Sequence, residues 1–232
     1  MRFLALLAVG LITAAAPEPS FDLLWRPKRD QTIDYALSLN IAVKDHRFQY
    51  DTKVHKKVLD VKDNGDYELE TSTQGTRIRM GVEAPMALDE EPAPTVETYT
   101  SRGERVGEDK VEDEESDQAD PVGKILGDVT EFTAPAAPVK QGETWTKDQQ
   151  DDPRKEQETA HIEYQVVGMD KDVVRVRYQY RERKDLDAVV ANGTFRLRRD
   201  DFSLVSCDTT VENFKMDDNA PAGTAKLSMH RI

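Results

Sequence analysis

The sequence has one cysteine, Cys207, among its 232 residues. A chain with a single cysteine forms no internal disulfide, so its fold depends on ordinary core packing. Disulfide-stapled small scaffolds are thereby excluded. Because Cys207 lies in an apolar-rich stretch with Phe202, Leu204 and Val205, we interpret it as a core residue rather than a reactive thiol.

Recognisable catalytic motifs are absent as well. The sequence contains no G-x-S-x-G, no H-E-x-x-H, no phosphate-binding loop and no C-x-x-C. Its four histidines lack the spacing of a metal site and are expected on strand surfaces. They are His46, His55, His161 and His230. We therefore predict a protein that acts by binding rather than catalysis and uses no cofactor or metal.

Basic residues are outnumbered, with 32 Lys and Arg against 45 Asp and Glu, for a net charge of −13. The imbalance is concentrated between Glu83 and Asp120, where fourteen acids face three bases. Without a basic stripe, a nucleic-acid partner is not expected. We interpret residues 83–120 as a solvated acidic loop, with a basic protein or cations as the alternative partners.

Only one long apolar run occurs, and it stands at the start of the chain. Arg2 precedes the uncharged stretch Phe3 to Ala16, which ends in three alanines. This pattern predicts a cleaved secretory signal peptide over residues 1–16. The run is shorter than the roughly 20 residues of a membrane span, and no cysteine follows the cleavage site. We expect a secreted or periplasmic protein with no transmembrane span after cleavage.

The mature chain is dominated by strand patterns. Every second residue from Ile33 to Ile41 is apolar, which indicates a strand with one buried and one wet face, as in an antiparallel sheet. Asn64-Gly65, between two such runs, predicts a tight hairpin because both residues tolerate positive φ. Further alternating runs follow at residues 160–180, 193–214 and 225–232. One helix is expected after Asp120, with an apolar stripe of Val122, Ile125, Leu126 and Val129.

Two short stretches resemble each other, one at Pro27 to Tyr35 and one at Val139 to Trp145. Each has a lysine, a turn residue, an acid or amide, a threonine and a bulky residue. We interpret them as the starts of two similar β units. The predicted organisation is a signal peptide (1–16), a first β unit with the acidic loop (17–119), a helix and proline-rich connector (120–138) and a second β unit (139–232). The fold class is mainly β: an antiparallel curved sheet, half-barrel or sandwich from two similar β units, with one connecting helix.

A signal peptide, twisted antiparallel strands and a covering helix together resemble the periplasmic lipoprotein-carrier half-barrels (LolA/LppX-like). The stretch P-x-x-P-V-x-x-G-E-T-W, here Pro135 to Trp145, is similar to an element of uncharacterised secreted bacterial β proteins with duplicated halves. The carrier resemblance implies binding of acyl chains in a hydrophobic cavity. The few helices and the large acidic loop depart from that family.

The first functional hypothesis is therefore an exported binding protein that carries or senses an apolar or lipid-like ligand in the cell envelope. The alternative is an envelope interaction module that uses the acidic loop and the sheet edges. Aromatic and apolar residues at inward strand positions and on the helix are the candidates for lining a cavity. They are Tyr35, Leu37, Tyr50, Ile125, Leu126, Val129, Tyr164 and Tyr178.

Overall fold

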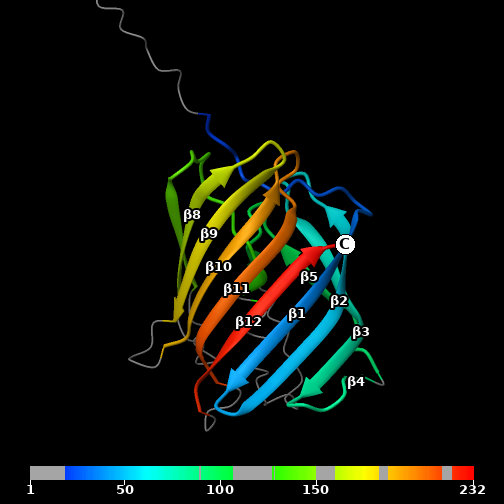
Figure 1. The fold of residues 1–232 in the computed structure, drawn as a ribbon. Coiled ribbons are helices and arrows are strands. Elements are labelled where there is room, and N and C mark those ends of the chain that lie inside the picture. The colour runs from blue at the N-terminus through cyan, green and yellow to red at the C-terminus, as the bar shows by residue number, and fades with distance from the viewer. Residues whose placement is uncertain are drawn as a thin grey trace, which may run out of the picture.

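In the computed structural model, the described residues are 19–88, 90–106, 127, 129–149, 160–182, 188–215 and 221–232. They form one antiparallel curved sheet that is not closed (Figure 1). Its strands are β1 (Thr32–Val43), β2 (His46–Val61), β3 (Tyr67–Met80), β4 (Met86–Ala87), β5 (Thr95–Tyr99), β6 (Arg105–Val106), β7 (Thr144–Gln149), β8 (Ala160–Met169), β9 (Val173–Glu182), β10 (Val190–Arg198), β11 (Leu204–Phe214) and β12 (Gly223–Arg231).

The strand order is β6-β5-β3-β2-β1-β12-β11-β10-β9-β8-β7, with β4 paired to β3. Each half of the chain is a meander of neighbouring strands, and the halves join where β1 pairs with β12, the blue and red strands of Figure 1. The sheet's two ends are therefore β6 and β7, which come from the middle of the chain. The mainly β class is confirmed, and the single sheet matches the half-barrel rather than the sandwich.

The alternation predicted for the first strand is confirmed. Ile33, Tyr35, Leu37, Leu39 and Ile41 are all buried, because β1 lies in the middle of the sheet and turns this face towards the core. The predicted Asn64-Gly65 hairpin also forms, between β2 and β3. Its connection is looser than a two-residue turn, since pairing ends at Val61↔Tyr67 and only Gly65 has positive φ.

The core extends over the inward side of β1, β2 and β8–β12. Two irregular segments pack against it. The segment before β1 pairs with the residue that directly follows the connector (120–138), through hydrogen bonds between Phe21 and Val139 at 2.8 and 2.9 Å. Leu23 on that segment and Val129 on the connector are fully buried. Cys207 is buried as well, and burial raises the pKa of its thiol to about 12, consistent with a core residue.

The expected helix lies largely outside the described residues. Residues 127, 129 and 130 are helical, whereas 121–126 are not described. The expected signal peptide, residues 1–16, and residues 107–120 of the acidic stretch are also outside the described part. In the described part of the chain, no helix is long and apolar enough to cross a membrane.

Acidic residues nearer the start of that stretch have structural partners. Both oxygens of Glu91 bind Thr76, from its backbone N–H at 2.8 Å and its hydroxyl at 2.7 Å. Glu97 pairs with Arg105 at 2.7 Å. These hydrogen bonds from Thr76 hold the pKa of Glu91 below its usual value. The solvated-loop interpretation of residues 83–120 therefore does not extend to these two acids.

The two similar stretches form the same turn. In the first, the Lys28 N–H donates to the Gln31 side chain at 2.9 Å, and the Gln31 N–H donates back to the Lys28 carbonyl at 3.0 Å. In the second, Lys140 and Glu143 make the same two bonds at 2.8 and 3.2 Å. Both turns end where a strand begins, at β1 and at β7.

The same correspondence continues into the following strand. The Asp30 N–H donates to the Val58 carbonyl at 2.9 Å, and the Gly142 N–H donates to the Val166 carbonyl at 2.7 Å. Asp30 and Gly142 both have positive φ, at 61° and 88°. A register shift follows each valine, between residues 58 and 60 of β2 and between 166 and 168 of β8.

Gly142 provides a test of this turn. Its φ of 88° lies where L-residues are strained, and nothing lies within 4 Å of an added Cβ. Gly142→Ala is expected to lower the free energy of unfolding by about 1 kcal/mol. Gly127→Ala is the matched control, since Gly127 is helical and equally unobstructed, and it should raise stability by about 0.5–1 kcal/mol. Urea unfolding measures both, and equal effects would contradict the backbone argument.

Candidate functional site

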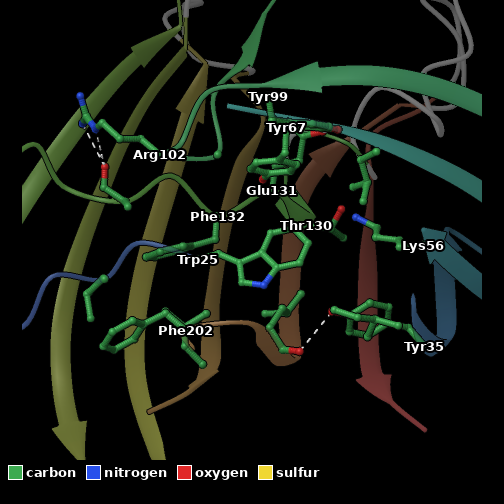
Figure 2. A pocket seen from close by; sticks show the side chains of 17 residues that line it. Trp25, Tyr35, Lys56, Tyr67, Tyr99, Arg102, Thr130, Glu131, Phe132 and Phe202 are labelled. Atoms are coloured by element: carbon green, nitrogen blue, oxygen red, sulfur yellow. Dashed lines mark hydrogen bonds between the residues drawn. The ribbon is translucent and has the colours of Figure 1, made fainter. Parts of the chain in front are cut away.

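A cavity of about 90 Å³, partly open to solvent, lies between the first half of the sheet, the β10–β11 hairpin and the two irregular segments (Figure 2). Its lining mixes aromatic and aliphatic side chains with a lysine, a glutamate and an arginine. The residues are Leu23, Trp25, Ile33, Tyr35, Lys56, Tyr67, Leu69, Tyr99, Arg102, Gly103, Thr130, Glu131, Phe132, Ala134, Leu197, Phe202 and Leu204. An apolar cavity with a few convergent polar groups is typical of a small-molecule site.

Trp25 lies in the middle of this lining (Figure 2). Its ring forms a T-shaped pair with that of Tyr67, with centroids 5.0 Å apart, and Tyr67 stacks on Tyr99 at 5.5 Å. Within the described residues, the buried Trp25 Nε1 has no hydrogen-bond partner. A buried donor without a partner costs roughly 1–3 kcal/mol, so this N–H indicates a place where a ligand or water acceptor would be stabilised.

Lys56 brings a cation to the same cavity. It occupies an inward position on β2 between the buried Val54 and Val58. Burial lowers the pKa of Lys56, and the carboxylate charge of Glu131 opposes that shift. Because an apolar side chain at this position would fit the core better, the lysine is a candidate for function rather than stability.

Glu131, on the connector, belongs to a chain of polar contacts. The Tyr99 hydroxyl lies 2.6 Å from a Glu97 oxygen and 3.0 Å from a Glu131 oxygen. A phenol has one proton to donate, so both contacts are hydrogen bonds only if one carboxyl is protonated. Arg105 pairs with Glu97 at 2.7 Å. Burial raises the pKa of Glu131, with Lys56 opposing, so a proton taken up by this pair of carboxyls is assigned to Glu131.

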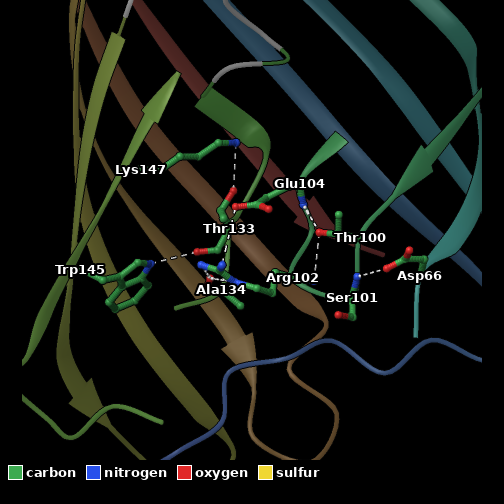
Figure 3. A network of polar contacts seen from close by, with 9 residues as sticks. All are labelled: Asp66, Thr100, Ser101, Arg102, Glu104, Thr133, Ala134, Trp145 and Lys147. Atoms are coloured by element: carbon green, nitrogen blue, oxygen red, sulfur yellow. Dashed lines mark hydrogen bonds and ion pairs between the residues drawn. The ribbon is translucent and has the colours of Figure 1, made fainter. Parts of the chain in front are cut away.

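The connector that carries Glu131 is held from both sides (Figure 3). On one side, Arg102 donates from Nε and Nη2 to the Ala134 carbonyl at 3.1 and 2.9 Å, and the Ala134 N–H donates to the Arg102 carbonyl at 2.9 Å. On the other side, Trp145 Nε1 donates to the Thr133 carbonyl at 3.0 Å, and Lys147 Nζ to the Thr133 hydroxyl at 3.1 Å. The wall of the cavity is thus fixed by residues from both ends of the sheet.

Gly103 allows this close approach. Its φ is 81°, and an added Cβ would lie 2.6 Å from the Phe132 carbonyl oxygen. Any other residue would push the β5–β6 turn away from the connector. The glycine therefore helps to position Phe132 and Glu131 at the cavity.

The structure places the predicted cavity residues in different environments. Tyr35 lines the cavity, and its hydroxyl donates to the Leu204 carbonyl at 3.1 Å. Leu37 is buried in the core, and Tyr50 is partly buried against it. Residues 125 and 126, the predicted Ile125 and Leu126, are outside the described part of the chain.

The other three predicted residues pack together in the core of the second half. Tyr164 and Tyr178 lie 6.2 Å apart between ring centroids, in a cluster with Phe195. The Tyr178 hydroxyl donates to the Val129 carbonyl at 2.7 Å. These contacts anchor the connector rather than line the cavity.

Most of the lining was missed by the sequence analysis. One signal was available for Lys56: in the run Val54-x-Lys56-x-Val58, a charged residue takes an inward place in a period-two pattern. No comparable signal marks Trp25 or Glu131. Both lie in irregular segments, where periodicity says nothing about which side chains face inward.

Two histidines lie on the opposite, outer face. His55 Nδ1 is 2.6 Å from Asp34, and His161 Nδ1 is 2.8 Å from Asp148, in each case on the neighbouring strand. Both imidazoles are substantially exposed. Among the described residues, no group of three or more His, Cys, Asp or Glu side chains could hold a metal ion.

Comparison with known proteins adds no family: no protein-family model matches the chain, and no curated protein matches it.

The protonation assigned to Glu131 predicts a pH dependence. Because the pKa of Glu131 is raised in the folded state, the folded protein keeps a proton that the unfolded chain has lost. Glu131 therefore makes the free energy of unfolding fall as the pH rises above the ordinary pKa of a glutamate. Glu131→Gln should therefore gain stability relative to the parent protein from about pH 5 to about pH 7, by at most about 1.4 kcal/mol per pH unit. Urea unfolding across this range measures the gain.

Glu163→Gln, at an exposed position of β8, is the control for the loss of one carboxylate. A constant difference between Glu131→Gln and the parent protein over this pH range would contradict the assigned proton.

Proposed function

We propose that this protein is an exported binding protein that holds a small, partly apolar molecule in the cavity beside Trp25. The observation that carries the proposal is the unpartnered Nε1 of Trp25, buried in an aromatic-lined cavity. Apolar side chains would take the body of the ligand, and the few polar groups would fix its orientation. The expected signal peptide supports a location in the cell envelope or outside the cell.

The size of the cavity limits the ligand. Its volume of about 90 Å³ is well below the roughly 300–1,000 Å³ of sites for drug-sized molecules. An engineered cavity of about 150 Å³ in another protein takes up benzene. The proposed ligand is therefore about the size of one ring, or a larger molecule that extends through the open side. A whole acyl chain, as the carrier resemblance implies, would need more room.

The energetics of the lining support a functional site. Lys56 and Glu131 are each buried at a cost, as the directions of their pKa shifts indicate. The Trp25 N–H adds the cost of an unmade hydrogen bond. Three destabilising groups around one cavity are typical of a site where stability is given up for binding.

We further infer that the sheet consists of two copies of one β unit, joined by the connector. The repeated Lys28 and Lys140 turns, the paired bonds to Val58 and Val166 and the register shifts after them support this. The copies have diverged where the cavity lies. Lys56, two residues before Val58, corresponds to Tyr164, which packs in the aromatic cluster.

Native mass spectrometry tests the binding proposal directly. The mature protein, purified without detergent from an exporting host, should carry an excess mass that disappears on denaturation and belongs to a small, partly apolar molecule. Repeated recovery of the bare protein mass, after incubation with host extract as well, would contradict the proposal.

Filling the cavity is the matching mutational test. Leu204→Phe adds volume at a partly buried lining residue and should leave the free energy of unfolding unchanged or raise it by about 0.5–2 kcal/mol, while removing the bound mass. Leu39→Phe, in the packed core at 1 % exposure, should lower stability by about 1–3 kcal/mol. Denaturant unfolding compares the two, and a similar loss for both would show that the cavity has no spare room.

A further inference from the structure

We propose that the molecule bound in this cavity is a small monocarboxylate, with its carboxylate held by Lys56 and Trp25 Nε1 and its apolar body against the aromatic wall. This inference rests on the proposed binding function and names the class of ligand. The two alternative classes of ligand are a neutral apolar molecule and an organic cation.

The available hydrogen-bond donors favour an acceptor group. Trp25 Nε1–H can only donate, and within the described residues it has no partner. The lysine ammonium likewise donates only, and Figure 2 shows the Lys56 amine turned towards the lining. A carboxylate has two acceptor oxygens and no donor, so it matches a lining in which both of these nitrogen groups can only donate. A purely apolar ligand would leave the indole N–H unsatisfied.

The charges favour an anion over a cation. An aromatic lining of Trp25, Tyr67 and Tyr99 could otherwise suit an organic cation. Lys56 repels such a ligand, and the one carboxyl that lines the cavity, Glu131, is bonded to the Tyr99 hydroxyl. Glu97 is already paired with Arg105. An incoming carboxylate would therefore meet Lys56, the one lysine in the lining.

The apolar surfaces set the shape of the rest of the ligand. Tyr67 and Tyr99 form a stacked pair with nearly parallel rings, at 13°. The Trp25 and Tyr67 rings are T-shaped to each other at 78°, and Tyr35, Phe132 and Phe202 complete the aromatic part of the lining. A flat ring or a short branched chain fits between such faces, at the size that the cavity volume allows.

The test uses three probes of one size and different charge: benzoate, toluene and benzylamine. The reporter is the indole N–H signal of Trp25 in ¹H–¹⁵N spectra of the mature protein. The chain has two tryptophans, and Trp145→Phe identifies the other signal. The Trp145 N–H already donates to Thr133 and serves as the internal reference. Benzoate should bind at least about tenfold more tightly than the other two and shift the Trp25 proton downfield, as a new hydrogen bond does.

Lys56→Met and Lys57→Met form a matched pair, since neighbouring strand residues point to opposite faces and Lys56 alone lines the cavity. Lys56→Met should weaken benzoate binding at least about tenfold and leave toluene binding unchanged, because only a charge-assisted contact is lost. Lys57→Met should change neither. Spectra of the free variants verify that both are folded.

The outcomes separate the two proposals. If toluene or benzylamine binds as tightly as benzoate, or if Lys56→Met keeps full benzoate affinity, the carboxylate assignment is wrong while the binding function stands. If none of the three probes moves the Trp25 signal and the purified protein carries no extra mass, both proposals are overturned.

Discussion

The attachment of the connector to both ends of the sheet is the constraint on which the rest of the structure depends. The sheet does not close through strand pairing, so its concave side would stay open if nothing joined its ends. Arg102 from the β5–β6 turn and Trp145 from β7 both bond the connector, at Ala134 and at Thr133. These bonds hold the two ends of the sheet to one short segment and place Glu131 and Phe132 in the cavity lining.

The same contacts explain why the two halves are packed differently despite their similar turns. In the second half, the connector packs into the concave face, where Val129 is fully buried and its carbonyl accepts a hydrogen bond from the Tyr178 hydroxyl. In the first half it leaves a gap, bounded by Trp25 and Lys56. The face of the second half is filled, which stabilises the fold. The face of the first half is less completely filled and leaves a cavity with polar groups whose burial is costly.

The polar groups of the cavity compensate one another only in part. Tyr99 links Glu131 to Glu97, and Arg105 neutralises Glu97. This leaves the Trp25 N–H as a buried donor without a partner among the described residues, and Lys56 as a buried amine whose pKa is lowered. Such an imbalance would be removed by selection for stability alone, since an apolar residue at position 56 would continue the pattern of Val54 and Val58.

The sequence by itself determined the strands. Period-two alternation from Ile33 to Ile41 and the hairpin at Gly65 are local patterns, and a buried sheet face requires them. It also marked the two similar turns, because positive φ at Asp30 and Gly142 restricts the residues there. Only the tertiary structure decided that β1 pairs with β12 and that the connector crosses the concave face. It therefore also decided the cavity, since Trp25 and Glu131 lie in segments without periodicity and meet Lys56 through long-range packing alone.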